Sequence, residues 1–145
     1  MTSAASRAEA ERLLLAAQKE HEAGRIDAAL ALALQAEDAD PEFAPARLYE
    51  GTTLITRKLD FSAGLAAIDR AVDLAPDDPG VQYSAGWCYE FVAYRLDRAG
   101  GRPFRDPDEL FRLAAGHLER CIAQEPEAKL KEDAEGLLQS IQDRL

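Results

Sequence analysis

Residues 16–41 read AAQKEHEAGRIDAALALALQAEDADP, and the spacing of the small and apolar residues in this stretch decides the fold. Steps of three and four residues separate a bulky residue from three small ones, namely Ile26, Ala29, Ala33 and Ala36. Such steps keep all four on one side of an α-helix. Pro41 ends the pattern, because proline lacks the backbone donor that a helix interior needs.

The same spacing returns twice along the chain. The second copy lies 35 residues later and consists of Phe61, Gly64, Ile68, Ala71 and Pro76. The third copy consists of Phe111, Ala114, Leu118, Cys121 and Pro126. Another helical pattern precedes each copy, so each unit is expected to form two antiparallel helices joined by a turn. A fixed period of roughly 20 to 50 residues indicates a repeat architecture, in which neighbouring units stack.

These residues resemble the tetratricopeptide repeat, in which small, apolar and proline positions recur over about 34 residues. The strongest unit carries the turn glycine Gly24, the alanines Ala29 and Ala36, and Pro41. The second unit departs from the family pattern, because Lys58-Leu59-Asp60 stands where the turn glycine would be. The resemblance covers nearly the whole chain. It implies an all-α array of αα-hairpins, about seven helices in a right-handed superhelix.

The repeat predicts one domain over residues 1–145, with three units and a C-terminal capping helix. The units lie near 8–42, 43–78 and 79–126, and the capping helix covers 128–144. Helices are expected near 5–23, 26–39, 43–57, 61–74, 79–98, 107–124 and 128–144. Residues with capping chemistry mark several of these starts, namely Ser6 with Glu9, Asp40 before Pro41, Asp78 before Pro79, and Asp106 with Glu109.

The third unit contains an insertion near 95–107. Thr52 and Gly64 are 12 residues apart, whereas the equivalent Gly86 and Ala114 are 28 apart, which adds about 16 residues. The insertion is locally basic in an acidic chain, with the arginines Arg95, Arg98, Arg102 and Arg105. Two interpretations stay open: these arginines contact an anion or an acidic peptide, or they pair with neighbouring acids on a solvated loop.

The first helix of the third unit has two apolar stripes. One suits the repeat core, and the other is aromatic. In the resembled family, the first helix of each unit lines a concave groove. The positions implied here are Leu14, Gln18, His21 and Glu22, then Tyr49, Thr53, Thr56 and Arg57, then Tyr83, Trp87, Glu90 and Phe91. Tyr94 continues the aromatic side of the same helix and is included in the candidate groove. Tyr, Trp and Arg dominate binding hot spots, which favours a partner-binding groove. Alternatively, Trp87, Phe91 and Tyr94 pack beneath the inserted loop against Phe104 and the last helix.

Composition argues against several classes of function. The formal net charge of −10 and the pI of about 4.7 disfavour nucleic acids and anionic membranes as partners. The sequence begins without a secretory signal pattern and has no run of eighteen apolar residues, so a cytoplasmic location is expected. Cys88 and Cys121 are expected to be reduced and buried.

No nucleotide-binding, metalloprotease or nucleophile-elbow motif occurs, and His21 and His117 lack the spacing of paired metal ligands. The sequence therefore predicts no enzyme, no cofactor and no metal site. The leading hypothesis is a protein–protein adaptor whose groove receives an extended or helical segment of a partner, with Tyr49, Arg57, Tyr83 and Trp87 as central contacts. Two alternatives stay open: a self-assembling, homo-oligomeric scaffold subunit, and a small cytoplasmic chaperone that shields an apolar segment of a client.

Overall fold

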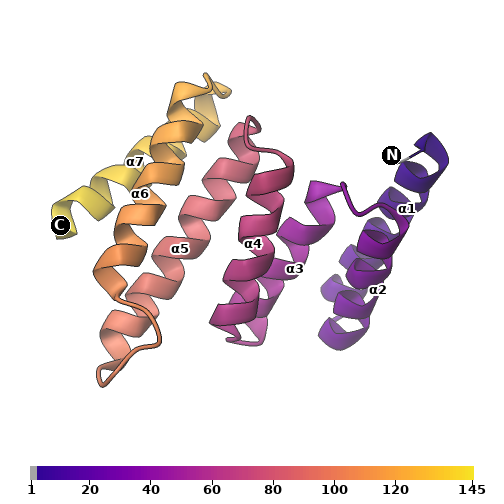
Figure 1. Ribbon diagram of the computed structural model, residues 1–145, viewed down its shortest axis with the longest axis horizontal. Helices are drawn as coiled ribbons and strands as arrows, with labels where there is room; N and C mark the ends of the chain where they lie inside the picture. Colours follow the sequence, from indigo (N-terminus) through magenta and orange to yellow (C-terminus); the bar gives the residue numbers. More distant parts are fainter. Residues whose placement is uncertain (1–2) are drawn as a thin grey trace. The chain divides into compact units, whose positions relative to one another are not determined.

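The computed structural model describes residues 3–145, which form seven helices and no strand (Figure 1). The helices are α1 (Ala4–Glu22), α2 (Ile26–Ala39), α3 (Ala44–Arg57), α4 (Phe61–Leu74), α5 (Pro79–Ala99), α6 (Pro107–Ala123) and α7 (Ala128–Arg144). Every helix bound predicted from the sequence agrees with these within one residue. The all-α hairpin-repeat class is therefore confirmed.

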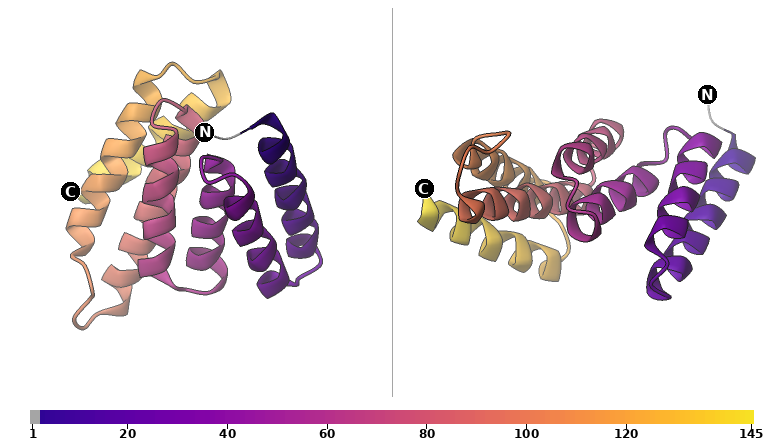
Figure 2. Two further views of the ribbon diagram at one scale, coloured as in Figure 1. Left: turned by 45° about the vertical axis from the view of Figure 1, so that its right-hand side comes forward. Right: turned by 90° about the horizontal axis from the view of Figure 1, so that it is seen from below.

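The helices pair as hairpins, α1 with α2, α3 with α4, and α5 with α6, and α7 packs on α6 and α5 (Figures 1 and 2). Their contacts divide the chain into two compact units, which differ from the three predicted repeats. The first unit ends at Leu74 and the second begins at Ala75, and 'first unit' and 'second unit' have this meaning from here on. In the first unit α2 also packs on α3. The single-domain organisation and the superhelix stay predictions, and each unit is described by itself below.

The first unit is held together by a seam of small residues. Ala29, Ala33 and Ala36 of α2 are fully buried, as their spacing predicts. Between α3 and α4 the closest residues are two glycines. A Cβ atom on Gly64 would lie 3.0 Å from the carbonyl oxygen of Gly51. Small residues that face each other let two helices approach closely, and the spacing predicts Thr52 opposite Gly64. This prediction is wrong by one residue, because Gly51 is the α3 residue that lies against the Gly64 backbone.

The two hairpin turns of the first unit share a conformation despite different residues. Gly24, between α1 and α2, has φ +83°, in the left-handed region that glycine adopts without strain. Leu59, the position 35 residues later between α3 and α4, has φ +55° in the same region. A leucine in that region is strained by its Cβ atom. The turn therefore keeps its geometry without the family's glycine.

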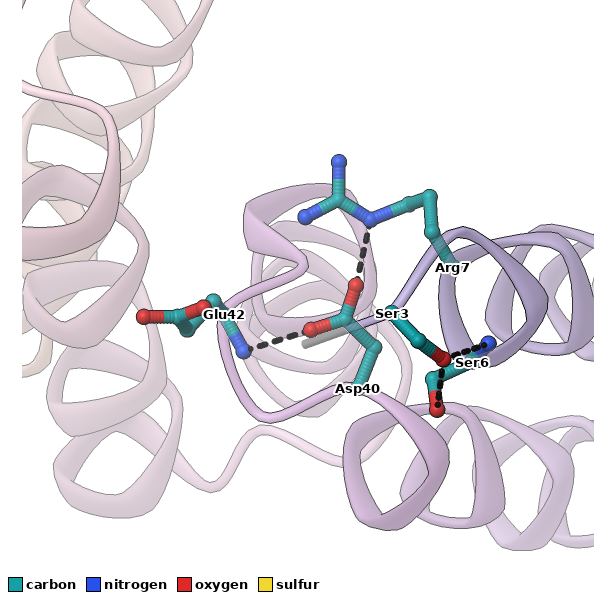
Figure 3. A network of polar contacts seen from close by, with 5 residues as sticks. All are labelled: Ser3, Ser6, Arg7, Asp40 and Glu42. Atoms are coloured by element: carbon teal, nitrogen blue, oxygen red, sulfur yellow. Dashed lines mark hydrogen bonds and ion pairs between the residues drawn. The ribbon is translucent and has the colours of Figure 1, made fainter. Parts of the chain in front are cut away.

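The polar network of Figure 3 connects the start of α1 to the segment between α2 and α3. Ser3 caps α1 by accepting the backbone N–H of Ser6 at 3.1 Å. Arg7 forms an ion pair with Asp40, which is fully buried and also accepts the N–H of Glu42 at 3.0 Å. The predicted capping roles of Ser6 and of Asp40 are thus wrong: Ser6 lies inside α1, and Asp40 ends α2 rather than starting α3.

The second unit repeats the hairpin with larger side chains. Asp78 and Asp106 cap α5 and α6 as predicted: Asp78 accepts the backbone N–H groups of Gly80 and Val81, and Asp106 accepts that of Asp108. The sequence predicts a core stripe on α5 of Val81, Ala85, Cys88, Val92 and Leu96, of which the first four are buried and Leu96 is half-buried. The α6 helix contributes the buried Ala114, Leu118 and Cys121. Within the described residues the two cysteines form no disulfide. The α7 helix contributes the fully buried Ala134 and Ile141.

The insertion lengthens the α5–α6 hairpin at its tip. Gly86 faces Ala114 as Gly51 faces Gly64, since a Cβ atom there would lie 3.2 Å from the Ala114 carbonyl oxygen. From this crossing α3 continues only to Arg57, whereas α5 continues to Ala99. We call residues 93–99 of α5 the α5 extension. No helix in the described part of the chain is long and apolar enough to cross a membrane.

Candidate functional site

The predicted site residues of the first unit lie on α3. Tyr49 packs against the core formed by α1 and α2, and its hydroxyl lies 2.9 Å from Nδ1 of His21. The hydroxyl of Thr56 donates to the carbonyl oxygen of Thr52 at 2.8 Å, and Arg57 is exposed. Thr53 is only 2% exposed, which removes it from the accessible surface. The predicted site residues of the first unit that a partner could reach are therefore Arg57 and the half-buried Tyr49 and Thr56.

In the second unit, aromatic side chains follow one side of α5. We call Tyr83, Trp87, Phe91 and Tyr94 the aromatic stripe. The rings of Trp87 and Phe91 stack, with centroids 5.3 Å apart and planes inclined by 21°. Both side chains are half-buried, and Tyr94 is exposed. The structure therefore brings these four predicted residues together on a single helix, with apolar ring surface still accessible to solvent.

The α7 helix borders the aromatic stripe. Burial raises the pKa of Tyr83, and Asp133 of α7 raises it further while Lys129 opposes it, so the start of α7 lies near Tyr83. At the other end, the Arg144 guanidinium lies 5.4 Å from the ring centroid of Tyr94. Because α7 begins near Tyr83 and ends near Tyr94, it runs in the same direction as α5. One edge of the stripe is therefore formed by α7.

Glu90 lies between the two ends of that edge. Burial raises the pKa of its carboxyl group, and the positive charge of Arg144 lowers it. Phe104 of the inserted loop is 51% exposed. The alternative interpretation, in which the loop and the last helix cover the aromatic residues, agrees with the position of Arg144 of the last helix beside Tyr94, whereas about half of the Phe104 side chain stays exposed.

The four arginines of the insertion divide into two groups. Arg95 and Arg98 lie on the α5 extension, each one turn after an aromatic residue. The Arg95 guanidinium is 5.6 Å from the Phe91 centroid, and that of Arg98 is 5.5 Å from the Tyr94 centroid. Arg105 instead pairs with Glu109 at 2.9 Å on the first turn of α6. The exposed Arg102 lies on the loop. Arg95 and Arg98 thus lie together on one helix, and contact of the four arginines with an anion stays a prediction.

A buried charged cluster in the first unit was missed by sequence reasoning. Glu37 is 5% exposed and accepts a hydrogen bond of 2.6 Å from Nη1 of Arg47 on α3. Burial raises the pKa of Glu37 to about 8, the neighbouring Glu50 adds to this, and Arg47 opposes it. Glu37, Asp38 and Asp40 form an acidic run at the end of α2, a pattern that is typical of a solvated helix end. The spacing contains no signal for the distant arginines that allow two of these acids to be buried.

Each of the two histidines contacts a neighbouring polar side chain. His117 is buried, with Nδ1 2.7 Å from the side-chain oxygen of Gln82, and His21 contacts Tyr49 as described. Over residues 3–145 no three His, Cys, Asp or Glu side chains gather in a way that could hold a metal ion.

The arrangement of hairpins defines a class of fold, and comparison with known proteins specifies it. No family model and no curated protein matches the chain. Among solved structures, the first TPR domain of Spaghetti (RPAP3), bound to the HSP90 peptide SRMEEVD, superposes with a TM-score of 0.70 at 19% identity. The match covers 95% of this chain and 94% of that one. The chain therefore has the tetratricopeptide-repeat fold that its spacing predicts.

Proposed function

We propose that the chain is a protein-interaction module that binds an extended or helical segment of a partner, and that the aromatic stripe of α5 makes the central contacts. The observation that carries the proposal is the stacked pair of Trp87 and Phe91. These rings lie off the α5–α6 core, which the opposite stripe of α5 already fills, and they keep accessible apolar surface. Large, rigid aromatic side chains of this kind contribute most to binding at protein interfaces.

The solved neighbour supports the same class of function, because that TPR domain is bound to a peptide. The peptide itself is not carried over to this chain. The groove-facing positions implied for α1 and α3 include Glu22, the buried Thr53 and the exposed Arg57, and none of these is a lysine or an asparagine that could bind a terminal carboxylate. In the first unit, Tyr49, Thr56 and Arg57 form a second, smaller contact surface.

The experiment compares wild type with the double variant Tyr83→Leu/Trp87→Leu in capture from a display library of short peptides. Leucine keeps apolar volume near α7, so the fold should survive, which circular dichroism would verify. We expect the affinity of the double variant for the peptides that wild type captures to fall by about 30-fold or more, since hot-spot truncations typically cost about 2 kcal/mol. The matched control is Leu15→Ala/Leu34→Ala, which trims leucines that are 61% and 47% exposed on α1 and α2.

The control should capture peptides as wild type does. A folded Tyr83→Leu/Trp87→Leu protein with unchanged capture would overturn the site assignment.

The exposed Leu15 and Leu34 also favour self-assembly as a second candidate function, because accessible apolar side chains can be covered by another copy. Light scattering over a range of concentrations tests it: a mass that rises with concentration in wild type, and not in Leu15→Ala/Leu34→Ala, would support a scaffold role.

A further inference from the structure

The aromatic stripe continues into two arginines on the same side of α5. Phe91 and Arg95 are four residues apart, as are Tyr94 and Arg98, so each guanidinium lies over the ring one turn before it. Arg98 also donates to the Tyr94 hydroxyl at 3.0 Å. A ring contact, and for Arg98 also a hydrogen bond, restricts the rotamers of an exposed arginine, so less entropy is lost when it meets an anion.

These two arginines have no carboxylate partner. Across residues 3–145, Arg95 and Arg98 take part in no ion pair, although the chain has 27 acidic residues against 17 basic ones. A third guanidinium, from Arg144, approaches the same Tyr94 ring, and the Asp97 carboxylate lies 3.6 Å from it. The guanidinium groups of Arg98 and Arg144, both beside the Tyr94 ring, repel each other, and an external anion would relieve that repulsion.

The positions of the two arginines relative to the aromatic rings indicate how long the bound segment is and where its apolar and acidic side chains lie. From Trp87 to Arg98 the helix rises by about 16 Å, at about 1.5 Å per residue. An extended segment covers that length with roughly five residues. Its apolar side chains would lie on Trp87 and Phe91, and its acidic side chains one to three residues further along would reach Arg95 and Arg98.

We propose that the α5 extension recognises an acidic amphipathic segment of a partner protein through the side-chain carboxylates that meet Arg95 and Arg98. This inference rests on the proposed function and names the partner's chemistry. The charged end of the surface lies in the part of α5 that has no counterpart in α3, so it belongs to the insertion and not to the repeated part of the hairpin. A chain with a net charge of −10 would otherwise repel such a segment.

The chain carries its own reporter for this site, because Trp87 is its single tryptophan. The probe is a peptide of leucine and glutamate, acetylated and amidated so that no terminal carboxylate is present. A second peptide has glutamine in place of every glutamate. Each is titrated into the full chain while the Trp87 fluorescence is followed. We expect saturable binding of the glutamate peptide, at least about tenfold weaker binding of the glutamine peptide, and weakening of the former by added salt.

The variant Arg95→Gln/Arg98→Gln should weaken the glutamate peptide about three- to tenfold and leave the glutamine peptide unchanged, as expected for two partly exposed charge pairs. The charge-matched control is Arg70→Gln/Arg112→Gln, which removes two exposed arginines from α4 and α6. This control should bind as wild type does. Equal affinities for both peptides, or equal weakening by both double variants, would overturn the acidic-segment proposal.

Three outcomes separate this inference from the proposed function. If neutral peptides bind and the glutamate peptide does not, the acidic chemistry is wrong and the interaction module stands. If no peptide of either kind binds here and none is captured from the library, both proposals fall. A single-stranded oligonucleotide is titrated in parallel, and if it binds more tightly than the glutamate peptide and loses affinity in Arg95→Gln/Arg98→Gln, the site takes phosphates and the acidic-segment proposal is overturned.

Discussion

Replacing Gly51 by alanine should destabilise the first unit, although alanine is the better helix former. The added Cβ atom would lie 2.7 Å from Cγ1 of Ile68 and 2.8 Å from the carbonyl oxygen of Gly64. Ile68 could change its rotamer, but the Gly64 oxygen belongs to the backbone of α4. Relief therefore requires α3 and α4 to move apart.

The size of the effect follows from two opposing contributions. Alanine stabilises a helix interior by about 1 kcal/mol relative to glycine. Against this, an ordinary contact begins at 3.4 Å, so the helices must separate by about 0.6 Å where they are closest. Forcing extra volume into a packed seam costs about 1–3 kcal/mol. We expect a net loss of about 1 kcal/mol, or a fall of about 4 °C in Tm for a chain of 145 residues.

The matched control is Gly136→Ala in α7, where a Cβ atom would meet nothing within 4 Å. Here only the helix-propensity gain applies, and we expect about 0.5–1 kcal/mol of added stability. Urea titration followed by far-ultraviolet circular dichroism compares wild type with the two variants. The reasoning is refuted if Gly51→Ala is as stable as wild type, or if both substitutions move the midpoint in the same direction.

Three other substitutions test separate features. The raised pKa of Glu37 means that the folded state holds its proton more tightly, so stability should fall between pH 4.5 and about 8, and Glu37→Gln should flatten that slope in urea titrations at a series of pH values. Leu59→Gly should stabilise the chain by about 0.5–1 kcal/mol, because glycine tolerates φ +55°; an unchanged Tm would contradict this. Arg7→Leu leaves the buried Asp40 carboxylate without its cation and should cost about 2 kcal/mol or more, whereas the exposed Arg12→Leu should leave the denaturation midpoint unchanged.

The positions of the helices could be predicted because they depend on local spacing. Ala29, Ala33 and Ala36 recur at helical steps, and their burial follows from that recurrence alone. Asp78 and Asp106 cap helices as predicted, since each acts on backbone groups two or three residues away. The prediction was wrong where two nearby residues could fill the same role. Ser3 and not Ser6 caps α1, and Gly51 and not Thr52 faces Gly64.

The candidate site was less predictable because it depends on contacts between distant segments. The aromatic stripe is visible in the spacing of α5, but the α7 edge beside Tyr83 and Tyr94 joins residues about 50 positions apart. The burial of Thr53 and Glu37 likewise results from neighbouring helices, and no local pattern encodes it. In the sequence Arg105 is one of four nearby arginines, and only its ion pair with Glu109, four residues later, separates it from the others.

The loop after α5 shows where a hairpin of this kind can change length over evolutionary time. Gly100 and Gly101 both have φ values near +70°, and a Cβ atom on either would meet nothing within 4 Å. Because the entropy of closing a loop grows only with the logarithm of its length, residues gained at such a tip cost little. The crowded crossings at Gly51 and Gly86 admit no comparable growth. Duplicated units can therefore diverge first at their tips, and new binding surface can arise there while the ancestral seam is kept.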